Sequence, residues 1–259
     1  MWQPDGWGWR ARIGVLMQHA DLGPESEFRA MAPAGVSIHA ARIPYHPLPP
    51  EEATDPVAAL EPNRAFAEPP HADEAAALLA AAPLHVIAFA FTSNSYVRGA
   101  ADDAALKARL EQRTRGIPVV VTCAAAVLAL RALGVGRLAL IDPPWFSPHL
   151  NALGAEYFRA QGFEVVYHAP ADLPRAALAI HPGLVYEWAR AHVPASAEAV
   201  FIGGNGFRTA GAIQALEEDL ERPVLTANSA ALWQALHLAG TRAPVTGYGR
   251  IFSYALPAQ

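Results

Sequence analysis

Short apolar runs alternate along this chain with Ala- and Leu-rich stretches that have helical spacing. This order is typical of parallel sheets covered on both faces by helices, in which strands are short and almost entirely apolar. The candidate strands are Ile13–Leu16, Val36–Ala40, Val86–Phe91, Val119–Thr122, Leu138–Ile141, Glu164–Tyr167, Ala199–Ile202 and Val224–Thr226. The candidate helices are Asp73–Ala81, Asp102–Arg113, Ala124–Leu133, His149–Ala160, Leu184–His192, Ala210–Glu221 and Ala230–Leu238. The alternation predicts an α/β protein built on parallel sheets.

Three segments of the first half recur, in the same order, in the second half. The matched pairs are Arg12–Leu16 with Arg137–Ile141, Val86–Phe89 with Ala199–Ile202, and Pro118–Val127 with Pro223–Leu232. The repeat predicts two pseudo-symmetric Rossmann-like (flavodoxin-like) domains, and chance similarity among Ala- and Val-rich segments is the alternative. We expect one domain at residues 10–120, joined by the segment from about 225 to 259, and the other at residues 121–224. Parallel sheets bind ligands beyond the carboxyl ends of their strands, so the site is expected in the cleft between the domains.

Composition narrows the class of protein. The 259 residues are 53% hydrophobic and 17% charged, which is enough apolar material for one large core or two small ones. A net charge of −5 without a Lys- or Arg-rich run argues against nucleic acid as a partner. No apolar run approaches the roughly 18 residues that span a bilayer, and the first residues carry no apolar leader, so a cytoplasmic protein is expected. The single cysteine and ten scattered histidines predict neither a disulfide framework nor a metal site.

Polar and glycine-rich turns follow two repeat-related strands. Their hydroxyl and backbone N–H groups can hold an anion without Lys or Arg, so we expect a small carboxylic acid as the ligand. The predicted substrate-binding residues in these turns are Thr92, Ser93, Asn94, Gly204, Asn205 and Gly206. Helix capping is the alternative role of the first two. The proline-rich stretch Pro44–Pro70 is expected to be irregular, either a solvated connector or a lid over the site.

Several motifs together resemble those of the Asp/Glu racemase superfamily. They are Arg12–Leu16 with Glu25 and Glu27, Thr92–Gly99, Arg131–Val135, Phe207–Thr209, and Pro223–Leu225 with Leu232 and Trp233. The similarity is to the branch of maleate cis–trans isomerases and arylmalonate decarboxylases, and it spans about residues 10 to 240 in the order of the family. The resemblance implies two α/β domains with the site between them, chemistry without a cofactor beside a carboxylate, and a homo-oligomer.

The resemblance also implies one or two catalytic cysteines, each directly before one of the two turns. In this chain Phe91 and Gly204 occupy those places, so both expected cysteines are absent. Cys123 could replace them, because it follows a strand that borders the cleft in this superfamily, and its repeat mate Asn228 would border the cleft from the other half. A helix start that lowered the pKa of its thiol would let it move a proton. The alternative is a small buried cysteine packed behind the turn.

Two acidic residues after the first strand, Asp21 and Glu25, are the other candidates for proton transfer, although both could simply favour a helix start. Aromatic residues at the predicted turns, Phe91 and Trp145 among them, would desolvate a carboxylate and so favour loss of CO₂. The leading hypothesis is a lyase that forms an enolate-like intermediate from a malonate-type acid. An isomerase or racemase of small carboxylic acids is the second hypothesis, and a catalytically inactive carboxylate sensor is the third.

Overall fold

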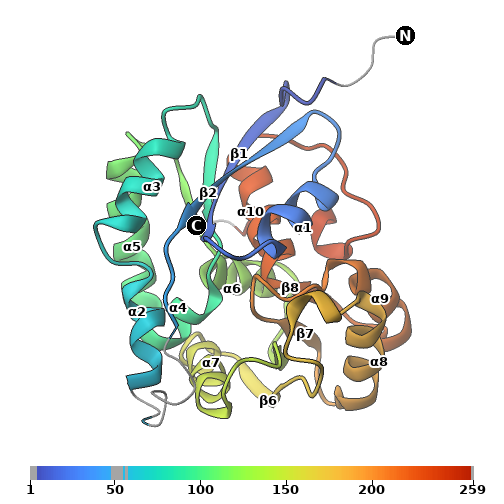
Figure 1. Ribbon diagram of the computed structural model, residues 1–259. Coiled ribbons are helices and arrows are strands. Elements are labelled where there is room, and N and C mark those ends of the chain that lie inside the picture. The colour runs from blue at the N-terminus through green and yellow to red at the C-terminus, as the bar shows by residue number, and fades with distance from the viewer. Residues whose placement is uncertain (1–4, 48–54, 56–57, 258–259) are drawn as a thin grey trace.

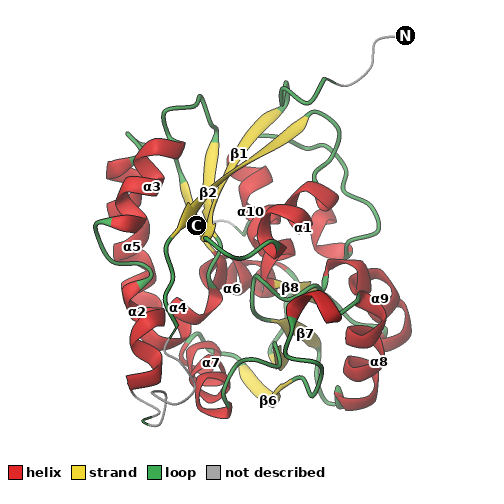
Figure 2. Ribbon diagram, in the orientation of Figure 1, coloured by secondary structure: helices red, strands yellow, loops and turns green. Residues whose placement is uncertain are grey.

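The computed structural model describes residues 5–47, 55 and 58–257, and its strands form two four-stranded parallel sheets (Figures 1 and 2). The first sheet has the order β2-β1-β3-β4, with β1 at Ala11–Gln18, β2 at Val36–Ile43, β3 at Val86–Phe89 and β4 at Val119–Val121. The second has the order β6-β5-β7-β8, with β5 at Arg137–Asp142, β6 at Glu164–Pro170, β7 at Ala199–Ile202 and β8 at Val224–Thr226. Every predicted strand is present, and the α/β class is confirmed.

The two sheets repeat one topology. In each sheet the first strand in the chain lies second in the sheet, and the next strand pairs on its outer side. The third and fourth strands then extend the sheet on the other side, as in the first four strands of the flavodoxin-like order. The segments matched in the sequence occupy equivalent places: β1 corresponds to β5, β3 to β7, and β4 to β8. The internal repeat is therefore a repeat of structure.

Helices follow the strands and cover the sheets (Figure 2). Their bounds are α1 Gly23–Met31, α2 Glu61–Ala65, α3 His71–Leu79, α4 Thr92–Arg98, α5 Ala100–Arg113, α6 Thr122–Ala132, α7 Pro148–Ala160, α8 Pro182–His192, α9 Ile213–Leu220 and α10 Ala227–Leu238. Prolines occupy the first turn of α1, α2, α7 and α8, where the missing N–H group has no helical partner to lose. A capping box between Thr226 and Ser229 begins α10.

Three segments differ from their sequence predictions. Thr92–Asn94 was expected to be a turn and is the first turn of α4, because the segment continues helically to Arg98. The proline-rich stretch holds a short 3₁₀ turn at Ala58–Leu60 followed by α2, while its residues 48–54 and 56–57 lie outside the described part. The helix expected at Ala210–Glu221 is divided into a 3₁₀ turn and α9.

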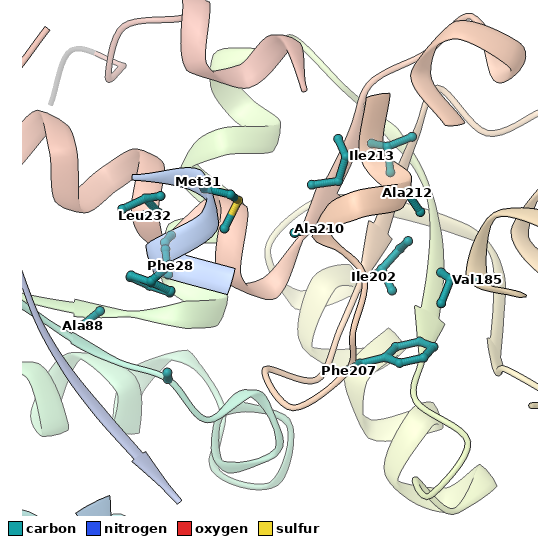
Figure 3. Packing of buried hydrophobic residues seen from close by; sticks show 14 of the residues in the cluster. Phe28, Met31, Ala88, Val185, Ile202, Phe207, Ala210, Ala212, Ile213 and Leu232 are labelled. Carbon is teal, nitrogen blue, oxygen red and sulfur yellow. The ribbon is translucent and has the colours of Figure 1, made fainter. Parts of the chain in front are cut away.

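The two halves share one core. The helices α6 and α10 pack against each other, and α10, although it follows β8, also contacts β3, β4 and α1. Figure 3 shows part of the cluster of buried residues that joins Phe28 and Met31 of α1 and Leu232 of α10 to Ile202 of β7. The C-terminal segment therefore packs back on the first sheet, and the proposed division into domains at residues 120 and 224 stays a prediction.

Across the described residues, the helices are all too short or too polar to cross a membrane. The expected cytoplasmic location and homo-oligomeric state stay predictions.

Candidate active site

A cavity of about 220 Å³ lies at the carboxyl ends of strands from both sheets. Its walls are the segments that follow β1, β3, β5, β6 and β7. The lining residues are Gln18, Ala20, Asp21, Phe91, Thr92, Ser93, Trp145, Phe146, Arg175, Ala177, Gly204, Asn205 and Gly206. This is the cleft position that the fold predicts for a ligand.

The two repeat-related turns are hydrogen-bonded to each other at this cavity. The N–H and the hydroxyl of Thr92 both donate to Oδ1 of Asn205, at 3.0 and 2.7 Å, across a sequence separation of 113 residues. The N–H of Gly204 donates to Oγ1 of Thr92 at 3.2 Å. All three residues are buried, so these bonds are shielded from water and hold the two turns in fixed register.

Glycines allow the second turn to take its path. Gly204 has a φ of +77°, and a Cβ there would lie 2.6 Å from Cγ of Pro143. A Cβ on Gly206 would lie 2.6 Å from Oδ2 of Asp21. Side chains larger than hydrogen would therefore be strained at the first position and would displace a carboxyl group at the second.

Asp21 is the carboxyl group that lines the cavity. Its Oδ1 accepts the N–H of Gly23 at 2.8 Å. Burial raises the pKa of Asp21, and this effect outweighs the opposing hydrogen bonds from the N–H groups of Gly23 and Leu22 and the charge of Arg42. A carboxylic acid whose pKa is raised by burial is the kind of group that donates a proton in an active site.

Glu25 and Cys123 lie elsewhere. Glu25 is absent from the cavity wall and forms ion pairs with Arg29 at 2.8 Å and Arg42 at 3.1 Å. Cys123 is fully buried in the second position of α6, with its Sγ 3.7 Å from the carbonyl oxygen of Thr92. Burial, with a contribution from Asp103, raises the pKa of this thiol well above its ordinary value, so the lowered pKa that proton transfer by Cys123 would require is not found.

Two further predicted binding residues are buried and absent from the described lining of the cavity. Asn94 is buried and does not line the cavity, and its side-chain atoms have no hydrogen-bond partner among the described residues. Asn228, in α10, is buried behind Asn205, whose Nδ2 donates to its Oδ1 at 2.9 Å. Asn228 is therefore bonded to one of the two turns, whereas the side chain of Asn94 is bonded to neither.

Three aromatic residues, Phe91, Trp145 and Phe146, line the cavity. Phe91, at the end of the segment after β3, packs on Phe66 with ring centroids 4.0 Å apart. Trp145 packs edge-to-face on Phe207 at 5.8 Å, and Phe146 also lines the cavity. The lining therefore combines apolar aromatic rings with the polar groups of the two bonded turns.

Arg175 also lines the cavity, although no motif around it predicts a place in the site. It is the one cationic side chain in the described lining, it is exposed, and it lies in the loop after β6. Arg175 lies five residues past the end of β6, so its place at the cavity depends on the path of the loop and not on the strand pattern. Within the described chain no group of three or more His, Cys, Asp or Glu side chains could hold a metal ion.

Comparisons with known proteins agree with this architecture. The family model for arylmalonate decarboxylase matches residues 70–252. The arylmalonate decarboxylase of Bordetella bronchiseptica is 33% identical over an alignment of 178 residues, and the alignment covers 64% of this chain and 70% of that protein.

Solved structures share the fold. The maleate isomerase Iso from Pseudomonas putida S16 has a TM-score of 0.82 at 21% identity, covering 94% of this chain and 98% of that one. A mutant Nocardia farcinica maleate cis–trans isomerase with a covalently bound succinylcysteine intermediate has a TM-score of 0.79 at 22% identity, covering 93% and 98%. A crystal structure of arylmalonate decarboxylase has a TM-score of 0.70 at 24% identity, covering 94% and 100%. By the match of the family model and of the Bordetella relative, this chain belongs to the arylmalonate decarboxylase family.

Proposed function

We propose that this chain decarboxylates a malonate-type acid without a cofactor and that Asp21 protonates the resulting carbon. The observation that carries the proposal is the carboxyl group of Asp21, its pKa raised by burial, in the same small cavity as the bonded turns and the aromatic wall. Membership of a family named for a decarboxylase supports the same reaction. The family model supports the type of reaction, and the position of Asp21 in the cavity supports its role as the proton donor.

Some hydrogen-bond donors in the two turns remain available to bind a substrate carboxylate. The N–H and the hydroxyl of Thr92 both donate to Asn205, so Thr92 positions the turns. The hydroxyl of Ser93 and the N–H groups of Asn205 and Gly206 donate to no acceptor within the described residues. These groups would hold the carboxylate that the product keeps and stabilise the negative charge that develops on it.

The proposed reaction needs one acid, and Asp21 supplies it. The bond between the central carbon and the departing carboxylate breaks, CO₂ leaves, and the electron pair moves into the retained carboxylate to form an enediolate. The carboxyl group of Asp21 then donates its proton to that carbon, and water returns a proton to Asp21. The wall formed by Phe91, Trp145 and Phe146 would desolvate the departing carboxylate and favour neutral CO₂.

The placement of the single thiol weighs against the isomerase hypothesis. The Nocardia relative carries a succinyl group covalently bound to cysteine. In this chain Cys123 is fully buried and absent from the described lining of the cavity. Covalent addition of a cysteine to maleate therefore has no thiol at hand in this cavity, whereas decarboxylation requires only the anion-binding turns and an acid.

A substrate panel in D₂O tests the function. Phenylmalonate, methylmalonate, maleate and aspartate would be incubated with the full chain, and release of CO₂ and the products would be followed by NMR. We expect a malonate to lose CO₂ and to gain one deuterium at the α carbon. Conversion of maleate to fumarate alone would establish the isomerase instead, and binding of these acids without any turnover would establish the sensor.

Arg175 is expected to draw the dianionic substrate toward the cavity. Arg175→Gln should lower kcat/KM for a malonate by about three- to ten-fold at low ionic strength and leave kcat nearly unchanged, because an exposed charge acts mainly on encounter. Added salt should shrink the difference between the variant and the wild type. Arg137→Gln is the matched control, since this exposed arginine lies at the amino end of β5, away from the cavity. Equal losses in the two variants would contradict the prediction.

A further inference from the structure

A buried glutamate in α1 is connected to the candidate active site by hydrogen bonds. Glu27 is 7% exposed, and its Oε1 accepts the N–H groups of Thr209 at 2.6 Å and Ala210 at 2.8 Å. Its Oε2 accepts Nδ2 of Asn228 at 2.7 Å. It does not line the cavity that holds Asp21 and the two turns; it lines the adjoining cavity of about 560 Å³.

Two asparagines continue the connection as far as Thr92. Oδ1 of Asn228 accepts Nδ2 of Asn205 at 2.9 Å, and Oδ1 of Asn205 accepts both the N–H and the hydroxyl of Thr92. Nδ2 of Asn228 also donates to the carbonyl oxygen of Asn205 at 2.9 Å. Each amide therefore turns its nitrogen toward Glu27 and its oxygen toward Thr92.

The direction of these bonds is set at their two ends. A carboxylate can only accept hydrogen bonds, and a backbone N–H can only donate them. Glu27 therefore fixes which end of the Asn228 amide faces it, and the N–H of Thr92 fixes the same choice for Asn205. We propose that Glu27 is a positioning residue for catalysis: through Asn228 and Asn205 it orients Thr92 and the two turns that receive the substrate.

Replacing this carboxylate by an amide makes two hydrogen-bond donors face each other. If Glu27 only filled space, an amide of the same shape would be tolerated. In Glu27→Gln the new NH₂ group must face either the N–H pair of Thr209 and Ala210 or Nδ2 of Asn228. Reversing both asparagine amides relieves the conflict at Glu27 and creates a new one at the N–H of Thr92. The register of the turns is lost in either case, because every one of these groups is buried.

The charge state of Glu27 makes the same connection sensitive to pH. Burial raises the pKa of Glu27 to about 7, with a further increase from Asp21, while the hydrogen bonds from Ala210, Asn228 and Thr209 oppose the shift. Around it, Arg208 and Tyr248 line the adjoining cavity, Arg42 of β2 is paired with Glu25, and α10 presents Asn228. Protonation places a donor where three donors already point. Activity should therefore fall as the pH drops through about 7.

Glu217 supplies a matched control. It is 5% exposed, accepts the N–H groups of Val224 at 3.0 Å and Arg250 at 2.8 Å, and pairs with the side chain of Arg250. It is thus a second buried glutamate that binds backbone N–H groups, but no hydrogen bond among the described residues links it to the cavity.

The experiment compares Glu27→Gln, Glu27→Asp and Glu217→Gln in the full chain, by thermal unfolding, by kcat and KM for a malonate over pH 5–9, and by calorimetric titration with malonate. We expect Glu27→Gln to lower kcat by about ten- to a hundred-fold and to abolish the acid limb near pH 7. Glu27→Asp should keep that limb, because it keeps a carboxylate, and Glu217→Gln should change neither. A Glu27→Gln variant with wild-type kcat, or a wild-type profile without the acid limb, would overturn the proposal.

The inference rests on the proposed function, and the titration separates the two. If the wild type decarboxylates no malonate, the decarboxylase proposal fails, and the role of Glu27 is then judged from malonate affinity alone. Weaker binding by about five-fold or more in Glu27→Gln, with loss of its pH dependence and no such change in Glu217→Gln, would support the positioning role. Equal affinities in all variants would refute it.

Discussion

Asp21→Asn should lower kcat for decarboxylation by a factor of about 10² to 10⁴, the range that a single proton donor contributes to catalysis. An asparagine keeps the shape of the side chain and still accepts the N–H of Gly23, which lies 2.8 Å from Oδ1 of Asp21. It has no acidic proton to give to carbon. Binding of malonate should therefore persist, so that the loss appears in kcat and only weakly in KM, as steady-state kinetics and calorimetry of the two proteins would show.

Cys123→Ala is the control that separates the two proton donors considered for this chain. The thiol is fully buried and its pKa is raised, so its removal should cost stability and leave kcat within about three-fold of the wild type. If instead the cysteine variant is inactive and the Asp21 variant is active, the assignment is reversed.

The pH profile gives a second test of Asp21. Its acid form is the active one, and its pKa is raised, so kcat should fall as the pH rises through that raised value. In Asp21→Asn the residual rate should no longer show this alkaline limb. A wild-type rate that climbs steadily toward alkaline pH would contradict the role of Asp21 as an acid.

The strand pattern and the repeat were sufficient to predict the fold and a cavity at the carboxyl ends of the strands. Val86–Phe89 and Ala199–Ile202 are short, wholly buried runs, and the turns after them meet because the two sheets share one strand order. The bond between Thr92 and Asn205 follows from that symmetry, since each comes at the same place after its strand. Local sequence carries this information because the apolar runs of the strands, and their order along the chain, can be identified from the sequence itself.

Side-chain roles were harder to predict, because they depend on packing between distant segments. Glu25 and Glu27 are two residues apart in α1, so they face different directions: one pairs with Arg42 at the surface, and the other is buried against Asn228. Cys123 is buried because α6 packs on α10, a contact more than ninety residues away along the chain. Nothing in the sequence near either residue distinguishes these outcomes.

The buried carboxyl group of Asp142, at the end of β5, should make the protein less stable as the pH rises. It is fully buried and accepts the hydroxyl of Tyr96 at 3.1 Å and Nδ2 of Asn151 at 2.8 Å, and burial raises its pKa from the ordinary 3.8 to about 7. Because the folded-state pKa is the higher one, its favourable contribution is complete below pH 3.8 and is lost as the pH rises to about 7. The full loss is about 4 kcal/mol, of which roughly 2–3 kcal/mol falls between pH 5 and pH 8.

Asp142→Asn should remove that pH dependence, because an asparagine does not ionise. The variant loses part of its hydrogen bonding to Tyr96 or Asn151, a cost that is the same at every pH. Urea unfolding at pH 5, 6, 7 and 8 would therefore show the free energy of unfolding of the variant gaining on that of the wild type as the pH rises, and Asp172→Asn, an exposed site, would show no such gain. Parallel curves for wild type and Asp142→Asn would mean that Asp142 is already ionised in the folded protein at pH 5. In that case a charged group would lie directly beneath the glycine turn, since a Cβ on Gly203 would be only 2.1 Å from Oδ1 of Asp142, and the turn would be a poor place to hold a carboxylate.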